Sequence, residues 1–204
     1  MAGTMPHAIF VETGLDDADA VAAYAAELPG CAVFAATDEA ASASMPRRVN
    51  EFTAWLRQGG LEAPTFVGDN WYEVERAAAV RDDAGLRRAR FTLDELPPSD
   101  EEFDRYLTWL ELAREDLATV LDSSAPPDAL LEAICGQDER FVAELGGRAP
   151  DPDPNPMDRL YGARDALTDA LRAAGAAADG VRGILRLAIA DDLRLADELR
   201  GAGD

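Results

Sequence analysis

An acidic turn follows the first apolar segment of the chain. Residues 7–13 form a run typical of a buried strand, which ends in Glu12 and Thr13. Gly14 follows, and the adjacent pair Asp16 and Asp17 comes two residues later. Three carboxylates this close repel one another unless a cation, a proton or a sugar hydroxyl compensates them. Open α/β sheets bind ligands at the carboxyl ends of their strands. The pattern therefore predicts a binding or catalytic site in this turn.

Each of these residues also has a purely structural interpretation. Asp16 and Asp17 fit the first turn of a helix, where carboxylates favour the positive end of the helix dipole. Glu12 ends a buried strand, where a charged side chain needs a partner. Asn70 and Trp71 follow a predicted third strand, and an aromatic ring at that edge suits stacking on a base. Trp71 equally suits the core or an interface.

The charge of the chain is extreme. Its 204 residues carry 40 acidic and 19 basic side chains, a net charge of −21, and every basic residue is arginine. Such a surface repels nucleic-acid phosphates and anionic membranes, so we expect neither as a partner. Adaptation to a salty cytoplasm explains the acidity more simply than a calcium-rich or basic partner.

The cysteines and the N-terminus indicate where the protein resides. Cys31 and Cys135 have no metal-binding spacing and are predicted to be buried and free. The first residues lack a signal-peptide pattern, and no apolar run is long enough to span a membrane. We therefore expect a cytoplasmic protein.

The first half of the chain predicts an α/β fold. Buried strands are expected at 7–13, 31–36 and 63–67, with helices at 16–28 and 46–58, the second capped by Ser44. This alternating order predicts a Rossmann-like parallel sheet with right-handed crossovers.

The second half predicts helices. A capping box at Ser99–Glu102 opens the first, Pro126–Pro127 the second, and amphipathic stretches at 157–174 and 179–200 complete the set. Between them, the Pro/Asp-rich segment 147–156 is expected to be extended. We therefore divide the chain into an α/β portion, 1–97, and a helical portion, 98–204.

The segment Glu12-Thr13-Gly14-Leu15-Asp16-Asp17-Ala18, with weaker matches downstream, resembles the N-terminal part of the inosine–uridine-preferring nucleoside hydrolase family. The resemblance covers about the first ninety residues. It implies that Glu12 binds Ca²⁺ and activates the attacking water. It also implies that Asp16 holds the ribose hydroxyls and that Asp17 is a calcium ligand. Hard oxygen ligands of this kind suit Ca²⁺.

Several positions depart from the family pattern. Phe10 and Thr13 replace an Asp and a Pro of the motif, while Ala41 and Arg81 replace an Asn and a His. We therefore expect a nucleoside-hydrolase-like protein that binds a nucleoside or ribosyl ligand with weak or no hydrolysis of the N-glycosidic bond. Two alternatives stay open. One is an active calcium-dependent N-ribohydrolase, and the other is a non-catalytic scaffold whose C-terminal helices bind a protein partner or a second copy.

Overall fold

The computed structural model describes five stretches of the chain: residues 7–15, 20–66, 71–81, 87–124 and 126–201. The chain divides into two compact units, Met1–Glu95 and Leu96–Asp204. The first unit is mixed α/β, and the second is built from four long helices, which confirms the predicted helical second half. Among the residues described, no helix is both long and apolar enough to cross a membrane.

A four-stranded mixed sheet forms the centre of the first unit. The strands are β1 (His7–Thr13), β2 (Val21–Ala25), β3 (Ala32–Ala35) and β4 (Trp71–Ala78), in the order β3-β2-β1-β4. β1, β2 and β3 are successively antiparallel, and β4 is parallel to β1. The prediction of a purely parallel sheet is therefore wrong, although the α/β class is confirmed.

β2 occupies part of the segment predicted as a helix over 16–28. All five of its residues are buried. A strand buried on both faces shows no alternation of apolar and polar residues. Its continuous apolar run cannot be told from a buried segment of helix by periodicity alone. The hairpin leaves β1 at Gly14, whose φ of +72° is the left-handed conformation that glycine adopts without strain. The amide of Leu15 donates to the carbonyl of Ala20, 3.3 Å away.

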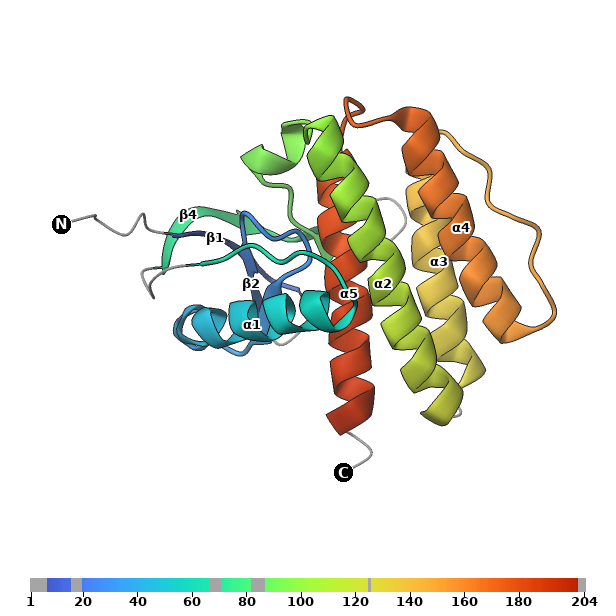
Figure 1. The fold of residues 1–204 in the computed structure, drawn as a ribbon, viewed down its shortest axis with the longest axis horizontal. Coiled ribbons are helices and arrows are strands. Elements are labelled where there is room, and N and C mark those ends of the chain that lie inside the picture. The colour runs from blue at the N-terminus through green and yellow to red at the C-terminus, as the bar shows by residue number, and fades with distance from the viewer. Residues whose placement is uncertain (1–6, 16–19, 67–70, 82–86, 125, 202–204) are drawn as a thin grey trace. The chain divides into compact units, whose positions relative to one another are not determined.

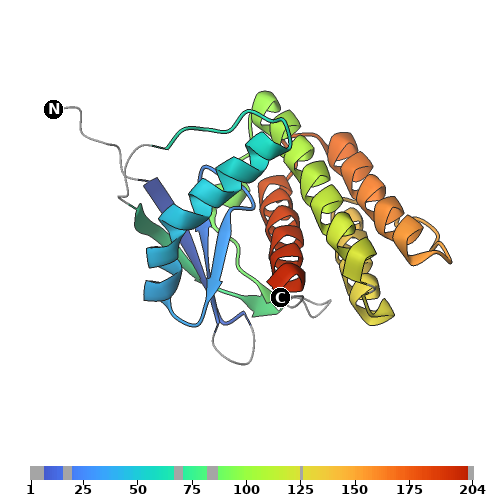
Figure 2. The same cartoon turned by 60° about the horizontal axis from the view of Figure 1, so that its bottom comes forward.

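Helix α1 (Asp38–Gln58) covers one face of the sheet (Figure 2). It begins earlier than predicted, because Thr37 rather than Ser44 is its cap. The Thr37 hydroxyl oxygen accepts from the amide of Ala40 at 3.2 Å. Pro46, which suggested a helix start, lies inside α1. The apolar face predicted for this helix consists of Val49, Phe52, Trp55 and Leu56; of these, Trp55 is half-buried and the other three are buried.

The predicted strand at 63–67 is also wrong. Residues 61–66 have no regular structure, and residue 67 lies outside the described part. Pro64 has no amide hydrogen to give to a strand ladder, which weakens that segment as a strand. The fourth strand instead starts at Trp71. A short antiparallel pair, β5 (Val80–Arg81) and β6 (Arg87–Arg88), and a 3₁₀ turn at Thr92–Glu95 complete the unit.

The second unit contains four helices, and their positions agree with the prediction. They are α2 (Asp100–Ser124), α3 (Asp128–Glu144), α4 (Pro156–Ala174) and α5 (Val181–Gly201). The capping box is confirmed: the amide of Glu102 donates to Ser99 Oγ at 3.2 Å, and the amide of Ser99 donates to Glu102 Oε2 at 2.9 Å.

The helices run as two parallel pairs, α2 with α5 and α3 with α4 (Figure 1). A parallel pair requires a connection that returns along the whole length of the first helix. α3 has 17 residues, about 25 Å at 1.5 Å per residue. The eleven residues 145–155 reach roughly 34 Å when extended at about 3.1 Å each. The Pro/Asp-rich linker, residues 145–155, thus makes this topology feasible.

Candidate functional site

Glu12 lies near the end of β1 and is fully buried, with no exposed surface. Its Oε2 accepts a hydrogen bond from the Tyr24 hydroxyl at 2.8 Å, and its Oε1 accepts from the amide of Ala89 at 2.5 Å. The first bond joins β1 to the neighbouring strand β2. The second holds the segment after β6 against the sheet. Both carboxylate oxygens of the predicted catalytic residue therefore have partners within the fold.

The segment 89–92 covers the sheet face to which Glu12 points. Phe91 stacks on Phe10 with ring centroids 4.9 Å apart, and it meets the ring of Tyr24 edge-on at 6.1 Å. At its far end, the amide of Thr92 donates to Glu75 of β4 at 2.9 Å. The carboxylates of Glu12 and Glu75 and the stacked ring of Phe91 thus hold this segment against the sheet.

The other predicted residues of the acidic turn, Asp16 and Asp17, lie outside the described residues, as does Asn70. Their predicted roles stay predictions. Across the ranges that the structure describes, no three His, Cys, Asp or Glu side chains converge as a metal site. The calcium site proposed for Glu12 and Asp17 likewise stays a prediction.

Trp71 is described, and it lies far from Glu12. It opens β4 opposite His7, whereas Glu12 is opposite Ala77 near the other end of the same parallel pair. Six residues of strand separate Trp71 from Ala77, about 20 Å at roughly 3.3 Å per residue. The structure therefore does not bring Trp71 and Glu12 together around one small ligand.

Trp71 belongs to an aromatic cluster at the start of the sheet. Its ring centroid is 4.7 Å from that of His7 and 5.9 Å from that of Phe66. Its indole Nε1 is buried and has no hydrogen-bond partner among the described residues. The cluster packs the beginning of β1 against the chain that leads into β4.

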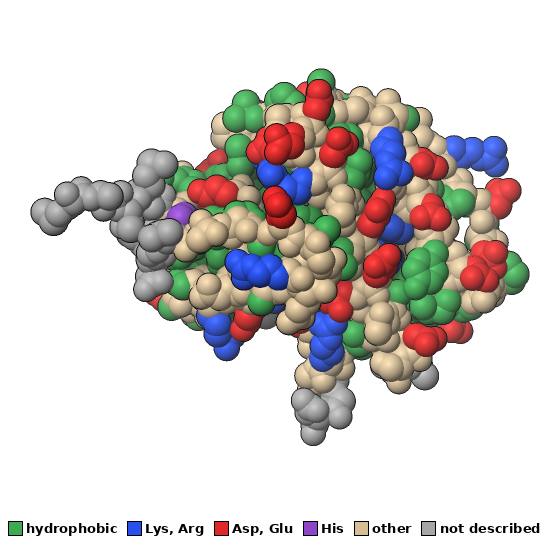
Figure 3. Space-filling view, in the orientation of Figure 1, with side chains coloured by type: hydrophobic (Ala, Val, Ile, Leu, Met, Phe, Trp, Pro, Cys, Tyr) green, Lys and Arg blue, Asp and Glu red, His purple; other side chains and the backbone are tan. Residues whose placement is uncertain are grey.

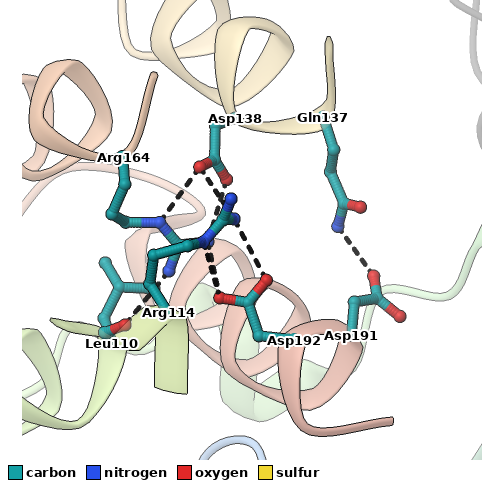
Figure 4. Close-up of polar contacts among 7 residues, drawn as sticks. All are labelled: Leu110, Arg114, Gln137, Asp138, Arg164, Asp191 and Asp192. Carbon is teal, nitrogen blue, oxygen red and sulfur yellow. Dashed lines mark hydrogen bonds and ion pairs between the residues drawn. The ribbon is translucent and has the colours of Figure 1, made fainter. Parts of the chain in front are cut away.

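The helical unit contains a buried charge network that sequence reasoning missed. Each helix contributes one residue, and all four are at most 3% exposed: Arg114 of α2, Asp138 of α3, Arg164 of α4 and Asp192 of α5. Figure 4 shows the two arginines and two aspartates facing one another. The formal charges cancel, which makes burial of such a cluster feasible.

The network is densely bonded. Arg114 donates from Nε and Nη2 to the carboxylate of Asp192 at 3.1 and 3.0 Å, and Nη2 also reaches Asp138 at 3.0 Å. Arg164 donates from Nε and Nη2 to Asp138 at 3.0 and 3.1 Å, and its Nη2 lies 3.0 Å from Asp192. Its Nη1 donates to the carbonyl of Leu110 at 3.2 Å. Every helix is thus tied to at least two others.

Burial and pairing shift the pKa values of the charged groups in and beside this network. Desolvation raises the pKa of Asp192 above its usual value, although Arg114 and Arg164 oppose the shift. The pKa of Arg164 is raised, since Asp138 and Asp192 outweigh the desolvation that lowers it. The neighbouring Asp191 accepts from Gln137 Nε2 at 2.7 Å, and burial raises its pKa as well.

A sequence signal for this network exists. Arg114 lies four residues after Leu110 and three before Leu117, on the apolar stripe of α2. Asp138 is placed in the same way between Ile134 and Phe141 on α3. A charged side chain at core spacing must be paired when the helix packs. One such residue on each of four helices predicts mutual pairing.

A cavity of about 250 Å³ lies in the same unit, between the first half of α3, the start of α4 and the end of the linker. Leu131 and Cys135 supply apolar surface, and Asp128, Glu132 and Asp153 supply carboxylates. Arg159 is the basic residue of the lining, and its Nη2 is bonded to Glu139 at 3.2 Å. Both cysteines are free and buried, as predicted.

The chain matches no protein-family model, no curated protein and no solved structure. The resemblance to the nucleoside hydrolases therefore stays a prediction that rests on the residues of the acidic turn.

Proposed function

We propose that this chain is a non-catalytic binding protein rather than an N-ribohydrolase. The observation that carries the proposal is the environment of Glu12. A carboxylate that activates water must have an oxygen within reach of that water. Glu12 has no exposed surface, and its two oxygens accept from Tyr24 and Ala89. These contacts support a structural role for Glu12.

The proposed ligand of the N-terminal unit is a nucleoside or another ribosyl compound, bound at the acidic turn. Glu12 lies beside this turn at the end of β1, and the turn begins at the left-handed Gly14. Asp16 is the proposed partner of the ribose hydroxyls, and Asp17 is the proposed ligand of a Ca²⁺ ion. Both assignments rest on the resemblance.

Two variants of Glu12 separate a structural from a catalytic carboxylate. Glu12→Ala removes the carboxylate that accepts from the Tyr24 hydroxyl and from the Ala89 amide, and the loss of these two buried hydrogen bonds costs about 2–4 kcal/mol of stability. Glu12→Gln retains an oxygen for the Ala89 amide, and its amide group can donate to the Tyr24 oxygen. We expect thermal unfolding to show a large loss for Glu12→Ala and a small one for Glu12→Gln. Equal losses would contradict the structural role.

Calorimetry with Ca²⁺ and inosine, together with a ribose-release assay, tests the proposed function. We expect binding without release of ribose, and we expect Glu12→Gln to bind as the unaltered chain does. Release of ribose that disappears in a folded Glu12→Gln variant would overturn the proposal and favour the calcium-dependent hydrolase. Absence of both binding and release would overturn ligand binding and favour the scaffold alternative.

A further inference from the structure

The cavity beside the linker contains a buried hydrogen-bond donor that has no acceptor. Arg159, near the start of α4, lines this cavity, and its Nε is buried and has no hydrogen-bond partner within the part of the chain that the structure describes. Its Nη2 bonds Glu139 at 3.2 Å, which holds the guanidinium in place without using Nε. The Arg159 side chain is 26% exposed, so its outer part meets solvent while Nε does not. A ligand that brings an acceptor to Nε removes the cost of leaving this donor unpaired.

The guanidinium lies close to the floor of the cavity, which is formed by Leu131 and Cys135. Both side chains are buried. Burial raises the pKa of the Cys135 thiol, and the positive charge of Arg159 is near enough to oppose that rise. The unpaired donor therefore belongs to the inner part of the cavity, beside an apolar surface.

The other polar groups of the lining are acceptors. Asp128 and Glu132 lie one turn apart on α3, and Asp153 lies on the linker. Pro154 and Pro156 complete the linker side of the cavity, and proline has no amide hydrogen to donate. The lining thus offers three carboxylates as acceptors and one guanidinium as a donor.

This combination excludes several classes of ligand. A cation satisfies the carboxylates but leaves Nε of Arg159 without an acceptor. An anion supplies that acceptor but is repelled by three carboxylates. A neutral molecule with several hydroxyl groups satisfies both, because each hydroxyl donates one hydrogen and accepts through its oxygen. Its C–H groups can pack against the apolar floor and the proline rings.

We propose that this cavity binds a neutral polyhydroxylated molecule the size of one monosaccharide. One ligand oxygen accepts from Nε of Arg159, and ligand hydroxyls donate to Asp128, Glu132 and Asp153. The volume of about 250 Å³ is below the roughly 300 Å³ at which pockets for drug-sized ligands begin, which suits a single sugar ring.

The test follows the Nε–H group of Arg159 directly by ¹⁵N NMR of the full chain. Its signal is assigned as the arginine Nε–H signal that disappears in Arg159→Lys. The probe is methyl β-D-glucopyranoside, and the matched control compound is tetrahydropyran-2-methanol, which has the same ring and hydroxymethyl group but no ring hydroxyls. We expect the glucoside to shift the Arg159 signal in a saturable way and the control compound to have little effect.

Two pairs of variants measure the contributions of donor and acceptor by calorimetry. Arg159→Lys keeps a positive charge for Glu139 but lacks Nε–H, and the loss of one hydrogen bond should weaken glucoside binding roughly fivefold. Its matched control is Arg172→Lys, at an exposed position of the same helix outside the cavity. Glu132→Ala should also weaken binding, whereas Glu115→Ala, at an exposed position of α2, should not.

Four results would overturn the proposal. They are no shift of the Arg159 signal with the glucoside, an equal shift with tetrahydropyran-2-methanol, a larger shift with acetate or methylammonium at the same concentration, and unchanged affinity in Arg159→Lys. The measurements report on the helical unit through Arg159, whereas the inosine and ribose measurements report on the acidic turn. The two proposals therefore fail separately.

Discussion

Removing one charge from the buried network should destabilise the helical unit strongly. Asp138 accepts three hydrogen bonds, one from Arg114 at 3.0 Å and two from Arg164 at 3.0 and 3.1 Å, and it is 1% exposed. Asp138→Asn keeps the size of the side chain but leaves a net positive charge in the core. It also turns an amide group toward two guanidiniums. Removing one partner of a buried ion pair costs about 3–5 kcal/mol of stability. Because Asn retains one oxygen that can accept a hydrogen bond, we expect Asp138→Asn to cost about 3 kcal/mol, at the low end of this range.

Hydrogen exchange of peptides from α3 and α5 measures this loss in the helical unit alone. A loss of about 3 kcal/mol corresponds to exchange roughly 100-fold faster, where exchange follows opening of the whole unit. Asp165→Asn is the matched control, since Asp165 lies on the exposed face of α4. We expect the free energy of opening that its hydrogen exchange reports to stay within about 0.5 kcal/mol of the value for the unaltered chain.

A second variant restores neutrality. Arg114→Met removes a buried positive charge, so combining it with Asp138→Asn leaves Arg164 paired with Asp192, whose atoms are 3.0 Å apart. We expect the double variant to be more stable than the sum of the single losses predicts, by about 0.5–3 kcal/mol. Strict additivity, or an Asp138→Asn variant as stable as Asp165→Asn, would refute the view that charge balance holds the four helices together.

Two further outcomes are expected. Burial raises the pKa of Asp191 above 3.8, so the stability it contributes is present below that value and is lost as the pH rises through its folded pKa. Asp191→Asn, which still accepts from Gln137, should therefore match the unaltered chain near pH 3.8 and melt higher at pH 7; a lower melting temperature at pH 7 would contradict this sign. The acidic side chains are spread over the face drawn in Figure 3 rather than gathered in one patch, so salt should screen a general repulsion. With a net charge of −21 the melting temperature should rise from low to molar salt, and a flat or falling profile would count against adaptation to a salty cytoplasm.

Local signals in the sequence were sufficient to predict where the helices of the helical unit begin and end. Capping residues, proline positions and the 3.6-residue spacing of apolar side chains act within a few residues of one another, so the sequence displays them directly. Ser99 and Glu102 form the predicted capping box, and the four helices lie where the apolar stripes place them. The Pro/Asp-rich linker lacks helix and strand over 147–153, as its composition predicts.

The order and direction of the strands were decided only by tertiary structure. A fully buried strand and one side of a helix carry the same apolar residues, and β2 became a strand because β1 and β3 pair with both of its edges. The surroundings of the candidate site were decided in the same way. The sequence places a carboxylate at position 12, but the partners that engage it, Tyr24 and Ala89, come from 12 and 77 residues along the chain. The charge network similarly joins four helices whose contributing residues lie up to 78 positions apart. The spacing of a charged residue on an apolar stripe indicates that it is buried and needs a partner, but which residues become its partners depends on how the elements pack.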